Sequence, residues 1–135
     1  MKIRPFWTMI MVAILANFPV LPLASPALAQ AVDEPVRALI EAMAAGDAPR
    51  IRAQFAPTAT QAYGADGPMK TAAATARWLE TDIIERDGKV TNPQFAVSGN
   101  QVVVRGDYRS RGYASKADFL FTVENGQITS WRMRY

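Results

Sequence analysis

The sequence contains no cysteine and no histidine among its 135 residues. Without cysteine the fold cannot form a disulfide, so its stability must come from packing. The absence of both residue types also excludes the usual zinc and iron sites, and it excludes nucleophile pairs of the Ser-His or Cys-His kind. We therefore expect no metal and no cofactor, and any acid–base chemistry must use carboxylates, tyrosine, lysine or arginine.

Long apolar runs are also scarce, and the one that occurs lies at the N-terminus. Two basic residues precede an almost wholly apolar run from residue 6 to 15, and Ala27-Leu28-Ala29 fits the small-x-small rule for signal-peptidase cleavage. We predict that residues 1–29 are a signal peptide of a bacterial periplasmic or secreted protein whose mature chain begins at Gln30. A retained membrane anchor is the alternative, although an asparagine and two prolines within 17–22 interrupt the run.

Charge of one sign is not in large excess. The formal net charge is +3, and two of the positive charges lie within the first 29 residues, so the remaining domain carries only about +1. We therefore expect no nucleic-acid partner, and no membrane association after signal cleavage. Residues 30–135 are enough for one domain with a modest core.

The first half of this domain has helical patterns. Apolar residues from Val36 to Met43 recur at helical spacing, Gly46 suits a helix C′ position and Asp47 suits the N-cap of a second helix over 48–55. A loop rich in glycine and proline should follow. The sequence then predicts a third helix over about 69–85. Its apolar stripe would contain Met69, Ala72, Ala76, Leu79 and Ile83.

The second half predicts an antiparallel meander. Four strands are expected over about 90–98, 101–110, 113–123 and 127–135. Asn125-Gly126 supplies the two positive-φ residues of a type I′ hairpin turn. If all three connections are two-residue turns, the register places Arg105 opposite Asp118 and Asp107 opposite Lys116.

This register divides the strand side chains between two faces. Burial favours the more apolar set against the helices, with the charged pairs outside. A bulge would shift the count by one residue and exchange the faces beyond it. The apolar set is Phe95, Val97, Val102, Val104, Phe119, Phe121, Val123 and Ile128, and the other set is Val103, Arg105, Asp107, Lys116, Asp118, Leu120, Trp131 and Met133.

The order of Ala45-Gly46-Asp47, Phe55-Ala56 and the Asn125-Gly126 hairpin resembles the nuclear transport factor 2-like, or SnoaL-like, superfamily over nearly all of the chain beyond residue 32. The resemblance implies an α+β fold in which three N-terminal helices pack on a curved antiparallel sheet that forms a cone. A cystatin-like sheet wrapped on one long helix is the alternative. The superfamily includes ketosteroid isomerases, polyketide cyclases, ligand binders and interaction modules, so it does not imply one reaction.

The resemblance also indicates candidate catalytic residues. Asp118 looks like the carboxylic acid that lines the cavity of ketosteroid isomerases, with Arg105 beside it to tune its charge. Leu39, however, takes the place of that family's oxyanion-stabilising tyrosine, and Tyr63 falls near its carboxylate base. The alternative interpretation of Asp118 is one half of a solvent-facing strand pair.

Three aromatic residues are candidates for ligand binding. Tyr63, Trp78 and Trp131 could line an apolar cavity with hydroxyl or indole donors, although aromatic residues at such spacings are commonly plain core. Two functions follow. The first is an exported, non-enzymatic domain that binds a small apolar ligand or a protein partner, as a homodimer formed through the outer sheet face. The alternative is a small cofactor-free isomerase, cyclase or epoxide-hydrolase-like enzyme that uses Asp118.

Overall fold

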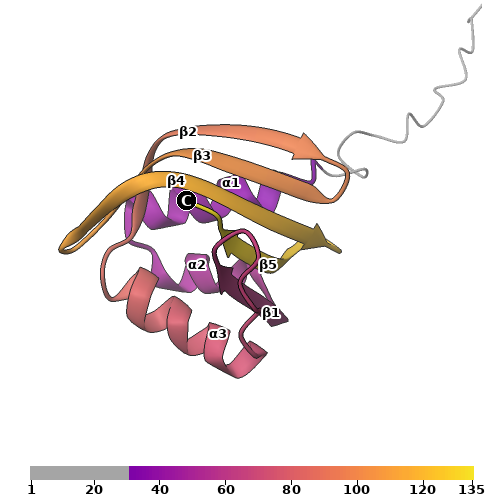
Figure 1. The fold of residues 1–135 in the computed structure, drawn as a ribbon, viewed down its shortest axis with the longest axis horizontal. Helices are drawn as coiled ribbons and strands as arrows, with labels where there is room; N and C mark the ends of the chain where they lie inside the picture. The colour runs from indigo at the N-terminus through magenta and orange to yellow at the C-terminus, as the bar shows by residue number, and fades with distance from the viewer. Residues whose placement is uncertain (1–30) are drawn as a thin grey trace, which may run out of the picture.

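The computed structural model describes residues 31–135, so the predicted signal peptide and the cleavage before Gln30 lie outside the described residues. The described chain is α+β, as expected, with helices first and most strands afterwards (Figure 1). The elements are α1 (Glu34–Ala45), α2 (Ala48–Ala53), β1 (Phe55–Tyr63), α3 (Ala72–Trp78), the π-helix η1 (Leu79–Ile84), β2 (Lys89–Ser98), β3 (Gln101–Ser110), β4 (Tyr113–Glu124) and β5 (Gln127–Met133).

All five strands form one sheet in the order β1-β5-β4-β3-β2. The neighbours from β2 to β5 are antiparallel, whereas β1 lies parallel to β5 at one edge. The expected all-antiparallel sheet is therefore wrong in this respect, and the segment expected to be a loop contains a strand. Its sequence has no clear apolar alternation and contains Pro57, which suits only an edge strand. Its partner is also distant in the sequence, so no hairpin signal could reveal the pairing.

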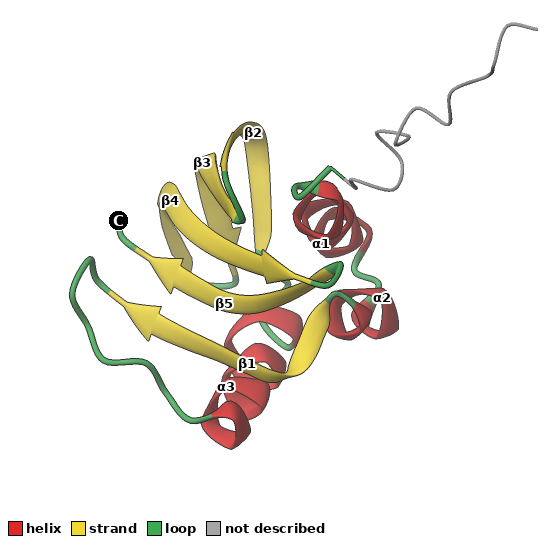
Figure 2. Ribbon diagram, turned by 90° about the vertical axis from the view of Figure 1, so that its right-hand side faces the viewer, coloured by secondary structure: helices red, strands yellow, loops and turns green. Residues whose placement is uncertain are grey.

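The helical joint near the N-terminus agrees with the sequence. Figures 1 and 2 show α1, α2 and α3 packed beside the strongly bent sheet, with β2, β3 and β4 arching over α1. The predicted apolar face of α1 is buried. Gly46 has a left-handed φ of 64° after α1, and the Asp47 carboxylate accepts a hydrogen bond of 3.2 Å from the Arg50 amide at the start of α2. Both predicted capping roles are confirmed.

The third helical segment differs from the expectation. It begins at Thr71, whose hydroxyl caps the Ala74 amide, so Met69 precedes the helix and is 42% exposed. From Leu79 onward the helix widens to π geometry, which moves successive side chains off the α-helical stripe. The predicted stripe is therefore only partly right. The buried residues of the observed segment are Thr75, Trp78, Leu79 and Ile83, and only the last two belong to the predicted stripe.

The strand register agrees with the sequence throughout the β3–β4 hairpin and, in the β2–β3 hairpin, from Gln94 to the turn, whereas a bulge between Thr91 and Gln94 shifts the earlier part of β2. Arg105 lies opposite Asp118 and Asp107 opposite Lys116, on the face away from the core. Asn125 and Gly126 have φ values of 52° and 75°, as a type I′ turn requires. Most of the apolar set is buried, although Val97 near the end of β2 is 51% exposed.

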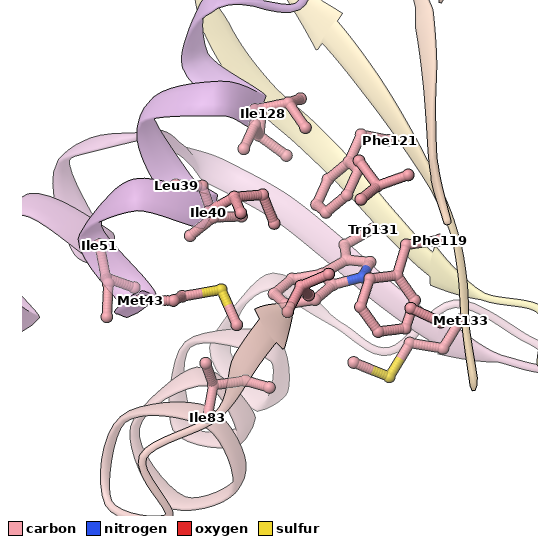
Figure 3. Packing of buried hydrophobic residues seen from close by; sticks show 14 of the residues in the cluster. Leu39, Ile40, Met43, Ile51, Ile83, Phe119, Phe121, Ile128, Trp131 and Met133 are labelled. Carbon is pink, nitrogen blue, oxygen red and sulfur yellow. The ribbon is translucent and has the colours of Figure 1, made fainter. Parts of the chain in front are cut away.

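A β-bulge at Thr129 changes the last strand. Thr122 pairs with Ser130 while Val123 pairs with Ile128, so β5 has one extra residue at this point. Beyond the bulge the faces exchange, and Trp131 and Met133 join Ile128 on the inner face. Their predicted place on the charged face is therefore wrong. Figure 3 shows Trp131 at the centre of the core, between side chains of the sheet and of the helices.

Candidate functional site

A cavity of about 260 Å³ lies between η1 and the neighbouring part of the sheet, and all four tyrosines of the chain line it. They come from four separate segments: the end of β1, the end of β3, the start of β4 and the C-terminal residue. Buried apolar side chains of η1, β4 and β5 complete the lining. The lining residues are Tyr63, Asp82, Ile83, Arg86, Tyr108, Ser110, Tyr113, Ser115, Phe119, Met133 and Tyr135. We call this the tyrosine cavity.

Tyr63 connects the core to the tyrosine cavity through hydrogen bonds. The indole Nε1 of the buried Trp78 donates to the Tyr63 hydroxyl at 2.5 Å, and that hydroxyl donates to Asp82 Oδ2 at 3.4 Å. The Lys70 ammonium lies 4.2 Å from the Tyr63 ring centroid, and Tyr135 stacks on the same ring at 6.5 Å. The position of the Tyr63 ring is therefore fixed by its contacts with helix, loop and C-terminus.

The loop that follows Tyr63 is held in place from β5. The Arg132 guanidinium donates hydrogen bonds of 2.9 and 2.8 Å to the carbonyl oxygens of Gly64 and Gly67. A side chain at Gly67 would collide with the Tyr63 carbonyl, which its Cβ would approach to 1.8 Å. Such bonds from a charged donor are among the stronger ones in proteins, so they help to hold the Tyr63 backbone at the cavity.

Burial keeps three of the four cavity tyrosines protonated. It raises the pKa of Tyr108 to about 12, and burial is also the main cause that raises the pKa values of Tyr63 and Tyr135. For Tyr63, the hydrogen bond from Trp78 opposes this rise, and the neighbouring Asp82 carboxylate adds to it. At neutral pH these side chains therefore offer hydroxyl donors and aromatic faces, and they do not serve as anionic bases.

Two charged side chains line the tyrosine cavity, and both belong to the segment around η1. The Asp82 carboxylate accepts hydrogen bonds from Tyr63 and from the Thr81 hydroxyl, the latter at 3.0 Å. On a regular α-helix the i,i+4 spacing of Asp82 and Arg86 would suit an ion pair, but no ion pair joins them in the part of the chain that the structure describes. The π-turn explains the difference, because it changes the spacing that an α-helical pair requires.

The predicted ligand-binding residues occupy three different environments. Tyr63 lines the tyrosine cavity and is 40% exposed. Trp78 lies behind it as a hydrogen-bond donor. Trp131 is completely buried and packs against Trp78 and Phe121 at centroid distances of 5.0 and 4.9 Å. Two of the three are thus brought together beside the cavity, and Trp131 lies deeper in the core.

The predicted catalytic candidates lie on the other face of the sheet. Asp118 forms an ion pair of 2.7 Å with Arg134 and a longer one of 3.8 Å with Arg105. Neither Asp118 nor Arg105 lines the tyrosine cavity. Leu39, which the resemblance to ketosteroid isomerases placed where those enzymes have a tyrosine, is fully buried in the core. Asp82 and Arg86 were not singled out as site residues, since on the sequence they resemble a solvated helix face.

Other kinds of site are limited within residues 31–135. No group of three or more carboxylate, histidine or cysteine side chains there could hold a metal ion. None of the described helices is long and apolar enough to cross a membrane. A second cavity of about 230 Å³ lies between β1 and α3, where Arg52 and Glu80 form a two-armed ion pair of 2.5 and 2.9 Å. Its remaining lining is mainly alanine, proline and other apolar residues.

The structure is therefore a small α+β domain with a cavity between a helical segment and a bent sheet. The sequence matches the SnoaL-like domain over residues 36–131, so the chain belongs to that family. Among proteins whose functions have been curated, none matches this sequence.

Several solved structures have a similar fold. A nuclear transport factor 2-like protein of unknown function from Cytophaga hutchinsonii is 19% identical, with a TM-score of 0.62 over 76% of this chain and 87% of its own. A candidate polyketide cyclase from Sinorhizobium meliloti is 21% identical, with a TM-score of 0.58 over 74% and 93%. TerC, co-crystallised with polyporic acid, is 19% identical, with a TM-score of 0.58 over 77% and 90%. These similarities establish the fold.

Proposed function

We infer that this domain binds a small aromatic molecule in the tyrosine cavity and does not act as an enzyme. The observation that carries the inference is the convergence of all four tyrosines, from four separate segments, on one cavity. A chain with only four tyrosines would not place all of them around one hollow if they served only as scattered core or surface residues.

The lining indicates the kind of ligand. Tyrosine offers an aromatic face for stacking and a hydroxyl for hydrogen bonding, and Ile83, Phe119 and Met133 add an apolar wall. The volume of about 260 Å³ is near the lower end for small-molecule sites, which span about 300 to 1,000 Å³. The cavity therefore suits a molecule of one or two rings with a few polar substituents. TerC, with its similar fold, was co-crystallised with polyporic acid, which agrees with this proposal.

Binding accounts for the lining better than catalysis. Three of the tyrosines have raised pKa values and remain neutral donors, and Asp82 already accepts hydrogen bonds from two neighbours. The sequence-based catalytic candidate Asp118 is engaged with two arginines on the outer face. The cavity thus has groups that hold a ligand, and Asp82, the carboxylate side chain of its lining, is already engaged by two hydroxyl donors.

The test is a calorimetric titration of the mature protein with 2-naphthol, together with mass spectrometry of ligands that co-purify with it. Replacing Tyr113 by Ala removes a side chain that is 47% exposed and whose hydroxyl makes no hydrogen bond within residues 31–135, so it should leave the fold intact. We expect about 2- to 10-fold weaker binding, from the roughly 0.5 to 1.5 kcal/mol of an aromatic contact. Val97→Ala, at an exposed position of β2 away from the cavity, is the matched control. Equal affinity in both variants, or no binding at all, would contradict the proposal.

Export is part of the same proposal. The support is the Ala27-Leu28-Ala29 site after an apolar run with a basic start. N-terminal sequencing of protein from the periplasm or medium should begin at Gln30. Exported material that still begins at Met1 would contradict the predicted cleavage.

A second candidate function is a cofactor-free enzyme such as a cyclase or isomerase. The observation that favours it is the Asp82 carboxylate in the cavity beside the Tyr63 hydroxyl, where it could take a proton from a bound ligand. A candidate polyketide cyclase is among the proteins of similar fold. If this function holds, Asp82→Asn abolishes turnover of a ligand that still binds, and Asp118→Asn, on the outer face, leaves turnover unchanged.

A further inference from the structure

The lining of the tyrosine cavity has two opposite charges four residues apart in the sequence, one beside Tyr63 and one beside the β3–β4 turn, and we call these two places its ends. At one end Asp82 lies beside the Tyr63 hydroxyl. At the other end Arg86 lies next to the β3–β4 turn, where the Arg111 amide donates to the Arg86 carbonyl at 2.9 Å. One end therefore offers an acceptor and the other a cation.

The two charges differ in how far the protein already satisfies them. Asp82 accepts from two hydroxyl groups, those of Tyr63 and Thr81. The Arg86 guanidinium has no ion-pair or hydrogen-bond partner among residues 31–135, although its neighbour Arg111 pairs with Asp87 at 3.7 Å. The positive charge at the cavity is thus the one that remains available to a ligand.

The neutral groups of the lining add to this preference for an anion. The hydroxyls of Tyr63, Tyr108 and Tyr135 are protonated at neutral pH, and Ser110 and Ser115 bring two more hydroxyl groups to the lining of the cavity. Hydroxyl and guanidinium donors together match the oxygens of a carboxylate, and an arginine fork can hold both oxygens at once. The acceptor at Asp82 matches a hydroxyl group on the far side of a ring.

We propose that the ligand is a small hydroxylated aromatic carboxylic acid, whose carboxylate binds Arg86 and whose ring lies among the tyrosines with its hydroxyl toward Asp82. This rests on the proposed binding function and gives it a ligand class. Arg86 then determines specificity, because it separates acids from neutral aromatics of the same shape.

The experiment compares 4-hydroxybenzoate with 4-hydroxybenzyl alcohol, which has the same ring and hydroxyl but no charge. Calorimetric titrations use the wild-type mature domain, Arg86→Gln and Arg77→Gln. Arg77 is a matched control, because it is an exposed arginine at the end of α3 that does not line the tyrosine cavity. We expect the wild type and Arg77→Gln to bind the acid about fivefold more tightly than the alcohol, as one exposed charge pair allows, with a smaller ratio at high salt. Arg86→Gln should bind the two equally.

The outcomes separate this inference from the proposed function. Equal binding of acid and alcohol by the wild type, or an unchanged preference in Arg86→Gln, overturns the assignment of the ligand class and leaves aromatic binding intact. The same is true if neither probe binds while 2-naphthol does. If none of the three aromatics binds, the proposed function fails and this inference fails with it.

Discussion

The hydrogen bond from Trp78 to Tyr63 can be tested by replacing Tyr63 with Phe. The substitution keeps the ring and its contacts with Lys70 and Tyr135, and it removes only the hydroxyl. The indole N–H of Trp78 then has no acceptor, although this side chain is only 5% exposed. A buried donor without a partner costs about 1 to 3 kcal/mol. Because Tyr63 is 40% exposed and water can enter from the cavity, we expect the lower part of this range, about 1 to 1.5 kcal/mol.

Thermal unfolding followed by circular dichroism provides the measurement. A loss of about 1 to 1.5 kcal/mol should lower Tm by roughly 4 to 10 °C in a domain of this size. Tyr113→Phe is the matched control, because the Tyr113 hydroxyl has no hydrogen-bond partner in the described part of the chain, and the Tm of this variant should change little. In the background of Trp78→Phe, which removes the donor, the cost of Tyr63→Phe should largely disappear, with a coupling of about 1 kcal/mol. A Tm of Tyr63→Phe equal to that of Tyr113→Phe would refute the reasoning.

Three further predictions concern the alkaline limit, the last turn and the oligomeric state. The pKa of Tyr108 rises from 10.0 to about 12 on folding, so the stability that its neutral form contributes is complete below pH 10 and is lost as the pH rises through 12. Because Tyr108 lines the open cavity, the free energy of unfolding should fall by only about 1 to 2 kcal/mol. Denaturant unfolding at pH 9 and at pH 11.5 should show a smaller fall in Tyr108→Phe than in the wild type. Gly126→Val should cost about 1 kcal/mol or more, because Gly126 has a φ of 75° that β-branched residues resist, and an unchanged Tm would contradict this. The homodimer through the outer sheet face stays a prediction, and its contact should be centred on the paired Val103 and Leu120. Light scattering at micromolar concentration should give twice the mass of one chain, and Leu120→Arg should reduce this mass to that of one chain. A wild-type mass of one chain would reject the dimer.

The outer face of the sheet has fewer large apolar side chains than the sequence predicted. With Trp131 and Met133 turned inward by the Thr129 bulge, Val103 and Leu120 are its large aliphatic side chains between the charged pairs. Because Trp131 and Met133 are both buried, a monomer does not expose a large aromatic patch on this face. Whatever dimer forms on this face must depend more on complementary charges than the sequence alone implied.

Local signals predicted the parts of the fold that local chemistry determines. Gly46, Asp47 and Asn125-Gly126 set backbone angles through their own conformational preferences, so the helix break and the last hairpin could be located from the sequence. The partners of Asp118 on β3 could be counted from two-residue turns. In each case the determining residues lie close together in the sequence or are related by a simple register.

The features that escaped prediction depend on residues distant in the sequence. The strand β1 pairs with β5 across about 70 positions, and Pro57 hides its strand character. The cavity residues Asp82 and Arg86 look like solvated helix residues until the π-turn and the sheet place them together. Of the three predicted ligand-binding residues only Tyr63 lines the cavity, and the other tyrosines escaped prediction because an isolated tyrosine at each of several separate positions has no pattern.

The bulge at Thr129 determines how the core is filled, and it thereby limits the size of the tyrosine cavity. Because β5 has one extra residue, the Trp131 side chain points into the core, where it packs against Phe55, Trp78, Phe119 and Phe121. This large side chain fills space that a bent sheet could otherwise leave hollow. The tyrosine cavity is therefore confined to the part of the interior beyond Phe119 and Met133, where tyrosines replace the fully apolar residues. Substitutions that reduce Trp131 should consequently enlarge the cavity only at the expense of the core, whereas changes at the exposed tyrosines can alter ligand preference with little loss of stability.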